Sequence, residues 1–265
     1  MNIIVCVKQV PDTNEVRIDP VKGTLIREGV PSILNPDDAN ALEEALKIKD
    51  KNPDTKITVL TMGPNQAIEM LKECLAMGAD EAILLSDRAF AGADTWATSN
   101  TIASAIRKIG NYDLIFAGRQ AIDGDTAQVG PQIAERLHLP QVTYVVGFEI
   151  KGDEITVNRQ LEDGYEIIKV KTPCLLTTIK ELNDPRYMTV GGIMDAFKKD
   201  TTIWGIKDLD ISESEVGLKA SPTQVFRSFT PEPKGKGRML SGTNAEMVAE
   251  LIGELNQKHL ISVEE

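Results

Sequence analysis

The chain of 265 residues has few cysteines, histidines and aromatic residues. Its three cysteines, Cys6, Cys74 and Cys174, lie far apart in apolar segments, which argues against a disulfide framework or a cysteine metal cluster and predicts buried thiols in a reducing compartment. The two histidines, His138 and His259, belong to no Ser/His/Asp or Cys/His arrangement. Aromatic residues make up 5% of the chain, so base stacking is a poor explanation of its surface. These absences disfavour a hydrolase.

Long apolar runs and an excess of positive charge are also missing. No apolar run approaches the roughly 20 residues that a membrane-spanning helix needs. The net charge of −11 argues against a surface for nucleic acid or for anionic membranes. The N-terminal sequence MNIIVCVKQVPD has the pattern of a strand rather than of a signal peptide. We therefore expect a cytoplasmic protein without a membrane span and without a nucleic-acid partner.

Short apolar runs alternate with stretches of helical periodicity along residues 1–140. A hairpin over 15–29, turning near Lys22 and Gly23, is expected after the first strand. This alternation is typical of βαβ units and predicts an α/β fold with an open parallel sheet and flanking helices. The expected strands are 2–8, 56–63, 81–87 and 112–118, and the expected helices are 35–50, 64–80, 94–110 and about 127–138.

The pattern changes in the second half of the chain. Residues 141–172 predict a β-meander, followed by a core strand in CLLTTIK and a helix over 193–199. From about 198 to 236 there is little periodicity, which indicates an extended arm. A helix capped by Thr243 then carries an apolar stripe that docks either on the chain's own core or on a partner. We predict a nucleotide-binding α/β domain over 1–200 and a C-terminal arm and helix over 201–265.

Ligands of open parallel sheets bind beyond the carboxyl ends of the strands. Glycine, proline, aspartate and threonine gather at these ends, as in TMGP after the second core strand and GADTWATS before a helix. Any one of these segments is also explained as an ordinary loop. Their convergence at one edge, together with the four side chains Asp94, Thr95, Thr98 and Ser99 around one helix start, favours a ligand site.

The segment AGRQAIDGDTAQVGPQIAERL, residues 117–137, combines a glycine-rich turn with the start of a helix. Pro131 belongs to the first helical turn, so the unpaired amides of residues 127–130 favour an anion. Asp123 and Asp125 would repel it unless they bond to their own backbone with Arg119 offsetting their charge; alternatively they hold Mg²⁺, for which no third ligand is evident. We favour a pyrophosphate or phosphate held mainly by amides, and no metal. The chain has neither a P-loop nor a Rossmann fingerprint, so a binding module outranks a hydrolase.

Several motifs together resemble the beta subunit of electron-transfer flavoproteins: VCVKQVPD, LNPDDANALEEAL, TMGP, CLAMGADEAILLSD, the segment 117–137, and ELNDPRYMTVGGIMDAFKK. The resemblance covers nearly the whole chain. It implies an adenine-nucleotide-binding, Rossmann-like fold and an alpha subunit that carries a flavin, on which the C-terminal arm and helix dock. By this resemblance the nucleotide phosphates are held by Thr126, Ala127, Gln128, Val129 and Gly130, and the nucleoside part by Val7, Lys8, Asn35, Met62 and Gly63.

Two types of this family differ in their nucleotide. Simple members hold structural AMP in the beta subunit, whereas bifurcating members hold a second FAD, which takes a hydride from NADH. The electrons then divide between ferredoxin or flavodoxin and the alpha-subunit flavin. SDRAFAGADTWATS resembles the bifurcating type, so Asp94, Thr95 and Thr98 are expected to hold FAD, with AMP as the alternative. A nucleotide-sensing regulatory domain, stable alone and colourless, is the second alternative.

The segment NDPRYMTVGG resembles the loop that grips a partner acyl-CoA dehydrogenase. The implied contacts are Pro185, Arg186, Tyr187, Met188 and Val190, where Val190 replaces the usual leucine; the alternative is a plain turn. Glu166 matches a position that pairs with a basic group of the alpha subunit, although an ordinary cross-strand glutamate explains it nearly as well. No catalytic side chain is predicted, because the chemistry belongs to the flavin. The resemblance implies that the chain itself is a carrier subunit and that the whole complex is expected to oxidise NADH.

Overall fold

The computed structural model describes residues 1–12, 31–226 and 235–261. The chain divides into two compact units, Met1–Arg227 and Ser228–Glu265. The predicted hairpin over 15–29 lies outside the described residues. The segments that precede and follow it are described, and they form a small antiparallel sheet of β2 (Gln9–Pro11) and β3 (Ser32–Leu34). Among the described residues, none of the helices is long and apolar enough to cross a bilayer.

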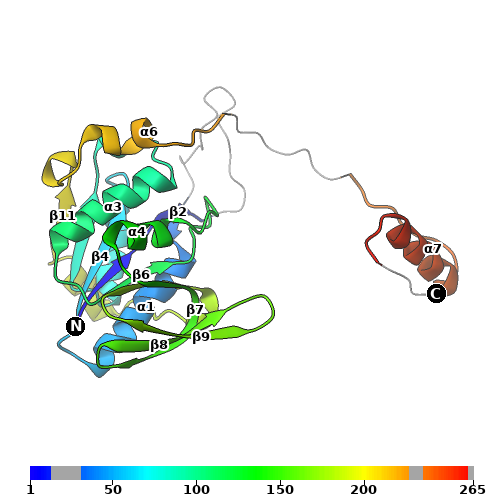
Figure 1. The fold of residues 1–265 in the computed structure, drawn as a ribbon, viewed down its shortest axis with the longest axis horizontal. Coiled ribbons are helices and arrows are strands. Elements are labelled where there is room, and N and C mark those ends of the chain that lie inside the picture. The colour runs from blue at the N-terminus through cyan, green and yellow to red at the C-terminus, as the bar shows by residue number, and fades with distance from the viewer. Residues whose placement is uncertain (13–30, 227–234, 262–265) are drawn as a thin grey trace. The chain divides into compact units, whose positions relative to one another are not determined.

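A nine-stranded sheet forms the centre of the first unit, in the order β11-β5-β4-β1-β6-β10-β7-β8-β9 (Figure 1). The strands from β11 to β7 pair in parallel, and β7, β8 and β9 pair antiparallel. The α/β prediction with its open parallel sheet is therefore confirmed. The strands are β1 (Asn2–Cys6), β4 (Lys56–Met62), β5 (Glu81–Leu85), β6 (Leu114–Gly118), β7 (Gln141–Lys151), β8 (Glu154–Gln160), β9 (Tyr165–Lys171), β10 (Cys174–Thr178) and β11 (Thr201–Trp204).

Helices cover both faces of this sheet. Strand β1 shows the reason: Ile3 and Val5 pack into one core cluster with α1 (Pro36–Lys51) and α2 (Ala67–Met77), whereas Ile4 and Cys6 pack into another with α3 (Thr95–Ile109) and α4 (Val129–Leu137). Successive strand residues point to opposite faces, so a continuous apolar run requires cover on both sides. The three cysteines are buried free thiols, as expected, and burial raises the pKa of Cys6 and of Cys174 to about 12.

Helix α5 (Val190–Ala196) begins three residues before the expected start at 193. Thr189 is the reason, because its side chain accepts a hydrogen bond from the Gly192 amide and caps the helix. Short 3₁₀ turns lie at η1 (Arg88–Phe90) and η2 (Lys180–Leu182). The predicted meander over 141–172 and the predicted core strand within 174–180 are both present.

Residues 201–226 are folded into the first unit, so the observed boundary differs from the predicted one at 200/201. The reason is β11, which pairs in parallel with β5 and extends the sheet. The turns η3 (Ile206–Asp208) and η4 (Glu213–Glu215) and the short helix α6 (Gly217–Ala220) follow it. The second unit contains α7 (Asn244–Gln257), which starts with the expected capping box of Thr243 and Glu246.

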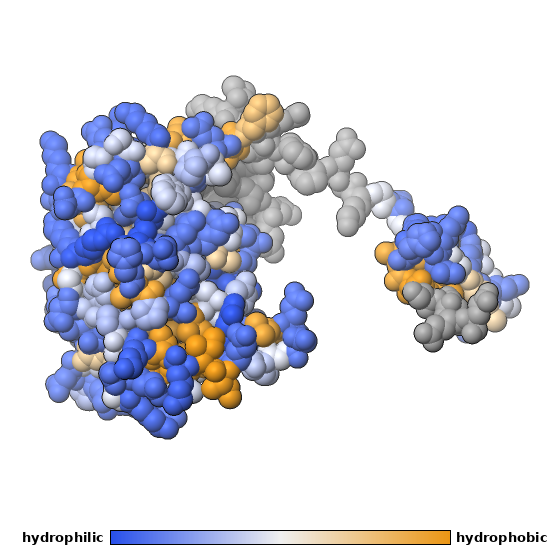
Figure 2. All heavy atoms as spheres, in the orientation of Figure 1, coloured by the Kyte–Doolittle hydropathy of each residue, from blue (hydrophilic) through white to orange (hydrophobic). Residues whose placement is uncertain are grey.

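Apolar side chains remain exposed in both units. Figure 2 shows a mostly hydrophilic face interrupted by apolar patches, and apolar side chains also gather on the second unit. On α7, Val248, Leu251 and Ile252 are each about half exposed. An amphipathic helix with its apolar stripe uncovered fits the predicted docking of this helix on a partner, which stays a prediction.

Candidate functional site

The carboxyl ends of β1, β4, β5 and β6 border a cavity of about 1390 Å³. It lies at the point of the sheet where the strand order reverses, because the chain runs from β1 to β4 and β5 on one side and then returns to β6 on the other. Twelve of the thirteen residues predicted to bind a nucleotide line it: Val7, Lys8, Met62, Gly63, Asp94, Thr95, Thr98, Thr126, Ala127, Gln128, Val129 and Gly130.

The start of α4 presents backbone amides to this cavity. Within the described residues, the amides of residues 126–130 donate to no protein acceptor, and the N-cap residue Gln128 makes no side-chain cap. The turn reaches this geometry through left-handed backbone at Asp125 and Ala127, with φ of 53° and 52°. A Cβ on Gly130 would lie 2.7 Å from Thr177 Cγ2, so glycine lets this turn pack against β10. Such a row of amides favours an anionic ligand.

The two aspartates of the turn are engaged by neighbouring side chains. Lys8 Nζ lies 2.6 Å from Asp123 Oδ1, and the Gln120 side-chain amide donates to Asp125. Arg119, expected to offset their charge, instead faces Asp37, with its Nε 3.4 Å from Asp37 Oδ2. Among the described residues, no three His, Cys, Asp or Glu side chains form a group that could hold a metal ion. These contacts show that Asp123 and Asp125 bind side chains of the surrounding loops.

Asn35, the thirteenth predicted residue, lies buried beneath the turn. Its side chain donates to the Gln120 carbonyl at 2.8 Å and accepts from the Ile122 amide at 3.1 Å. Asp38, in the first turn of α1, is a site residue that sequence reasoning missed. Its two carboxylate oxygens accept the amides of Lys8 and Gly118, each at 2.8 Å, and so tie the ends of β1 and β6 together at the cavity floor. The double acid in NPDD was its only signal in the sequence.

The buried Asp38 carboxyl makes stability depend on pH. Burial raises its pKa to about 7, and the hydrogen bonds from the Gly118 and Lys8 amides only partly oppose this. The pKa in the unfolded chain is about 3.9, so the folded state binds the proton more tightly. The resulting stability is fully present below pH about 3.9 and is lost as the pH rises through the range up to about 7. Asp38→Asn lacks this titration, so its stability deficit relative to the unaltered protein should be larger near pH 5 than near pH 8.

Urea unfolding of both proteins at the two pH values checks this expectation. Asp54→Asn, which alters an exposed carboxylate, serves as the control. A deficit of Asp38→Asn that is equal at both pH values, or smaller near pH 5, would contradict it.

Asp94 lines the cavity and at the same time caps α3. One oxygen accepts the Ala97 amide at 3.0 Å, and the other accepts the Thr223 hydroxyl at 2.7 Å and the Thr223 amide at 3.0 Å. Burial acts to raise the pKa of Asp94, but these hydrogen bonds outweigh it and lower the pKa. Thr223 comes from the segment expected to be an arm, and sequence reasoning missed it. Thr95 donates to Gln128 Oε1 at 2.9 Å and thereby joins the two loops of the site.

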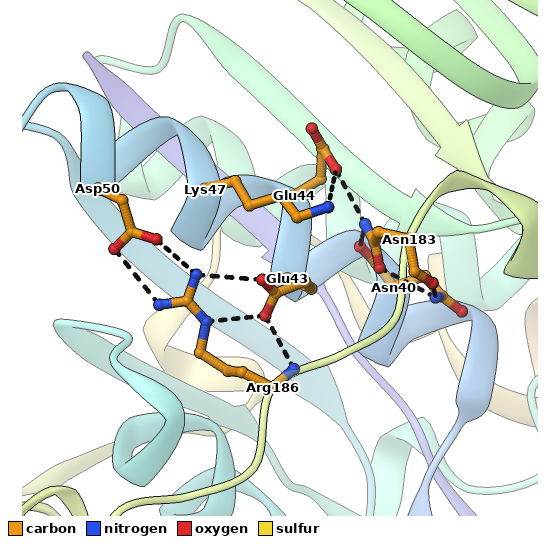
Figure 3. Close-up of polar contacts among 7 residues, drawn as sticks. All are labelled: Asn40, Glu43, Glu44, Lys47, Asp50, Asn183 and Arg186. Atoms are coloured by element: carbon orange, nitrogen blue, oxygen red, sulfur yellow. Dashed lines mark hydrogen bonds and ion pairs between the residues drawn. The ribbon is translucent and has the colours of Figure 1, made fainter.

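The predicted partner residues do not all face outward. The side chains of Tyr187 and Val190 are 95% and 77% exposed, and Pro185 and Met188 are also exposed. Arg186 instead turns back to α1 (Figure 3). Glu166 pairs with Arg159 on the neighbouring strand at 3.0 Å, as an ordinary cross-strand glutamate does.

Comparison with known proteins identifies a family match and close relatives. Residues 22–209 match the electron transfer flavoprotein domain. Subunit CarD of the caffeyl-CoA reductase-Etf complex of Acetobacterium woodii is 66% identical over 262 residues, covering 98% of this chain and 100% of that protein. Electron transfer flavoprotein subunit beta of Clostridium acetobutylicum is 60% identical over 261 residues, with 98% and 100% covered. The acryloyl-CoA reductase electron transfer subunit gamma of Anaerotignum propionicum is 53% identical over 269 residues, again with 98% and 100% covered.

Proposed function

Because the chain belongs to the electron transfer flavoprotein family as a beta subunit, we propose that its cavity holds an FAD that receives a hydride from NADH. The complex then bifurcates the electrons, delivering some to ferredoxin or flavodoxin and others, through the FAD of an alpha subunit, to an acyl-CoA dehydrogenase. The names of two relatives, from a caffeyl-CoA reductase complex and an acryloyl-CoA reductase, support a CoA-ester enzyme as the final acceptor. We place this assembly in the cytoplasm.

One observation carries the cofactor proposal: a row of amides that find no acceptor among the described residues borders a cavity larger than typical ligand cavities. Typical ligand cavities measure about 300–1,000 Å³. This cavity, at about 1390 Å³, extends from the α4 amides at 126–130 to the loops after β1, β4 and β5. The amides suit a pyrophosphate. The remaining volume suits the flavin ring system of FAD in addition to its adenine.

The chain's own groups position and shield such a ligand. The amides at 126–130 would hold the pyrophosphate, whereas the charge of Lys8, which also lines the cavity, is offset by its ion pair with Asp123. Val7 and Met62 supply apolar wall on the side of β1 and β4. The bound flavin supplies the redox chemistry, so the protein contributes orientation and electrostatics rather than an acid or a base.

AMP is the alternative ligand, and one observation favours it. Both oxygens of Asp94 already accept hydrogen bonds from Ala97 and Thr223, which leaves this carboxylate less available to a ribityl chain. In that case the subunit would be a structural support, with the amides at 126–130 holding a single phosphate.

The identity of the bound nucleotides tests the proposal. The complex with the alpha subunit is purified and denatured, and the released nucleotides are separated by chromatography and quantified by absorbance. We expect two FAD per heterodimer, because the cavity admits a whole dinucleotide. One FAD and one AMP per heterodimer would overturn the FAD proposal for this subunit.

A further inference from the structure

Arg186 makes a closed set of contacts with α1 (Figure 3). Its Nε and backbone amide both donate to Glu43 Oε2, at 2.8 and 3.0 Å, and its Nη2 donates to Glu43 Oε1 at 3.1 Å. Its guanidinium also binds both oxygens of Asp50, at 2.6 and 3.3 Å. These hydrogen bonds and charges together raise the pKa of Arg186. Four of the five N–H groups of the guanidinium are therefore engaged by its own chain.

Asn183 adds a second attachment to the same helix. Its side chain donates to the Asn40 carbonyl at 3.0 Å and to Glu44 Oε2 at 2.9 Å, while the Asn40 side chain donates to the Asn183 carbonyl at 2.6 Å. Asn40, Glu43 and Glu44 occupy successive positions on one side of α1, and Asp50 lies two turns beyond Glu43. Residues 183–186 are thus attached along α1 at several points.

The chain is held again a few residues later, by α2. A Cβ on Gly192 would lie 2.2 Å from the Ala76 carbonyl oxygen, so α5 approaches α2 as closely as backbone allows. At the other end of α5, Lys72 Nζ donates to the Ala196 carbonyl at 3.0 Å. Residues 187–191, here called the docking bridge, lie between the attachment of Arg186 to α1 and the attachment of Gly192 to α2. The docking bridge presents Tyr187, Met188 and Val190 to solvent.

We propose that Arg186 is a positioning residue that, through Glu43 and Asp50, holds the docking bridge in its binding conformation before a partner arrives. The proposal rests on the proposed role of this loop in binding a dehydrogenase. A segment fixed at both ends loses less conformational freedom when it docks, so its few apolar side chains bind more tightly. Arg186 then acts through the geometry of the bridge and makes no contact with the partner.

Glu43 separates positioning from direct contact. Glu43 is only 4% exposed and therefore unable to reach a docked protein. If Arg186 positions the bridge, Glu43→Gln and Arg186→Gln should both raise the KM for the dehydrogenase, by about tenfold, with kcat within about twofold. If Arg186 itself contacted the partner, Glu43→Gln would free the guanidinium and leave the KM unchanged or lower. Each single variant leaves one charge of the pair without its partner, which can destabilise the protein by itself. The double variant E43Q/R186Q removes both charges and so tests the loss of the attachment without an unpaired buried charge.

The experiment uses the full heterodimer and measures two things. The first is hydrogen exchange of the Arg186 and Gly192 amides, which needs no partner. The second is steady-state reduction of the acyl-CoA dehydrogenase. Lys51→Gln is the matched control, because Lys51 is an exposed residue of α1 that, among the described residues, makes no hydrogen bond or ion pair with residues 183–186.

We expect at least about tenfold faster exchange in E43Q, R186Q and the double variant, and unchanged exchange in the control. Unchanged exchange in all three variants, a KM that rises only in R186Q, or a fall in kcat at constant KM would overturn the positioning role. If the unaltered heterodimer reduces no acyl-CoA dehydrogenase, the proposed function fails, and the exchange measurement still decides whether Arg186 holds the bridge.

Discussion

Replacing Gly118 with alanine is expected to destabilise the protein by about 2–4 kcal/mol and, if the cavity holds a nucleotide as proposed, to lower the nucleotide content. A Cβ at this position would lie 2.4 Å from Asp38 Oδ1 and 2.8 Å from the Asp37 backbone. The Asp37 backbone belongs to the first turn of α1 and cannot move aside, and the Asp38 side chain is held by its two hydrogen bonds. The Asp38 carboxylate would have to release the amides of Gly118 and Lys8, both at the cavity floor.

Urea unfolding and nucleotide content of the purified complex measure both effects of Gly118→Ala. Gly164→Ala is the matched control, because nothing lies within 4 Å of a Cβ there and the position is in the turn between β8 and β9. Its stability should change by no more than about 0.5 kcal/mol, with full nucleotide content. If Gly118→Ala behaved as this control does, the close packing of α1 on β6 would be refuted.

The second large effect is expected from Val190→Asp, which should raise the KM for the dehydrogenase by about a hundredfold. Burying a valine side chain at an interface contributes about 1.5–3 kcal/mol, and an aspartate there would add the cost of desolvating a charge. Val190 is 77% exposed and is the first residue of α5, where a negative charge favours the helix. The variant should therefore fold normally while binding its partner poorly.

Two assays separate these outcomes for Val190→Asp: electron delivery to the dehydrogenase and NADH oxidation with an artificial dye. Only the first should fall. Val190→Leu is the matched control, because it enlarges the apolar side chain without charge and should leave the KM unchanged or lower. Loss of both activities in Val190→Asp would show that this position does more than bind the partner, and equal KM values for the two variants would remove it from the interface.

The sequence was sufficient for the βαβ part of the fold because each element there has its own periodic signal. The segment 56–62 has the buried, β-branched pattern of a central strand, and 36–51 carries a helical stripe, a proline start and basic residues at its end. The cavity followed from the same reasoning, since parallel strands bring their carboxyl ends to one edge. The strand ends and the family resemblance together supplied the twelve predicted residues that line this cavity.

Features that depend on distant partners could not be predicted. The four-residue β11 is a strand because it pairs with β5, more than a hundred positions earlier, and its own sequence TTIW is too short to show a period. Asp38 owes its role to two backbone amides, one of them 80 positions away. For Arg186, residue type alone did not reveal whether the guanidinium points outward or back to α1. Glu43 and Asp50, seven positions apart on one helix face, were the available hint.

Helix α1 serves both functional regions of this subunit. Asp38, in its first turn, ties down the cavity floor, and Glu43 begins the attachment of the docking bridge. An α-helix rises about 1.5 Å per residue, so these two carboxylates are separated by about 7.5 Å along the axis. If the cavity and the docking bridge have the proposed roles, this one hydrogen-bonded helix fixes the distance between the ligand and the bound partner.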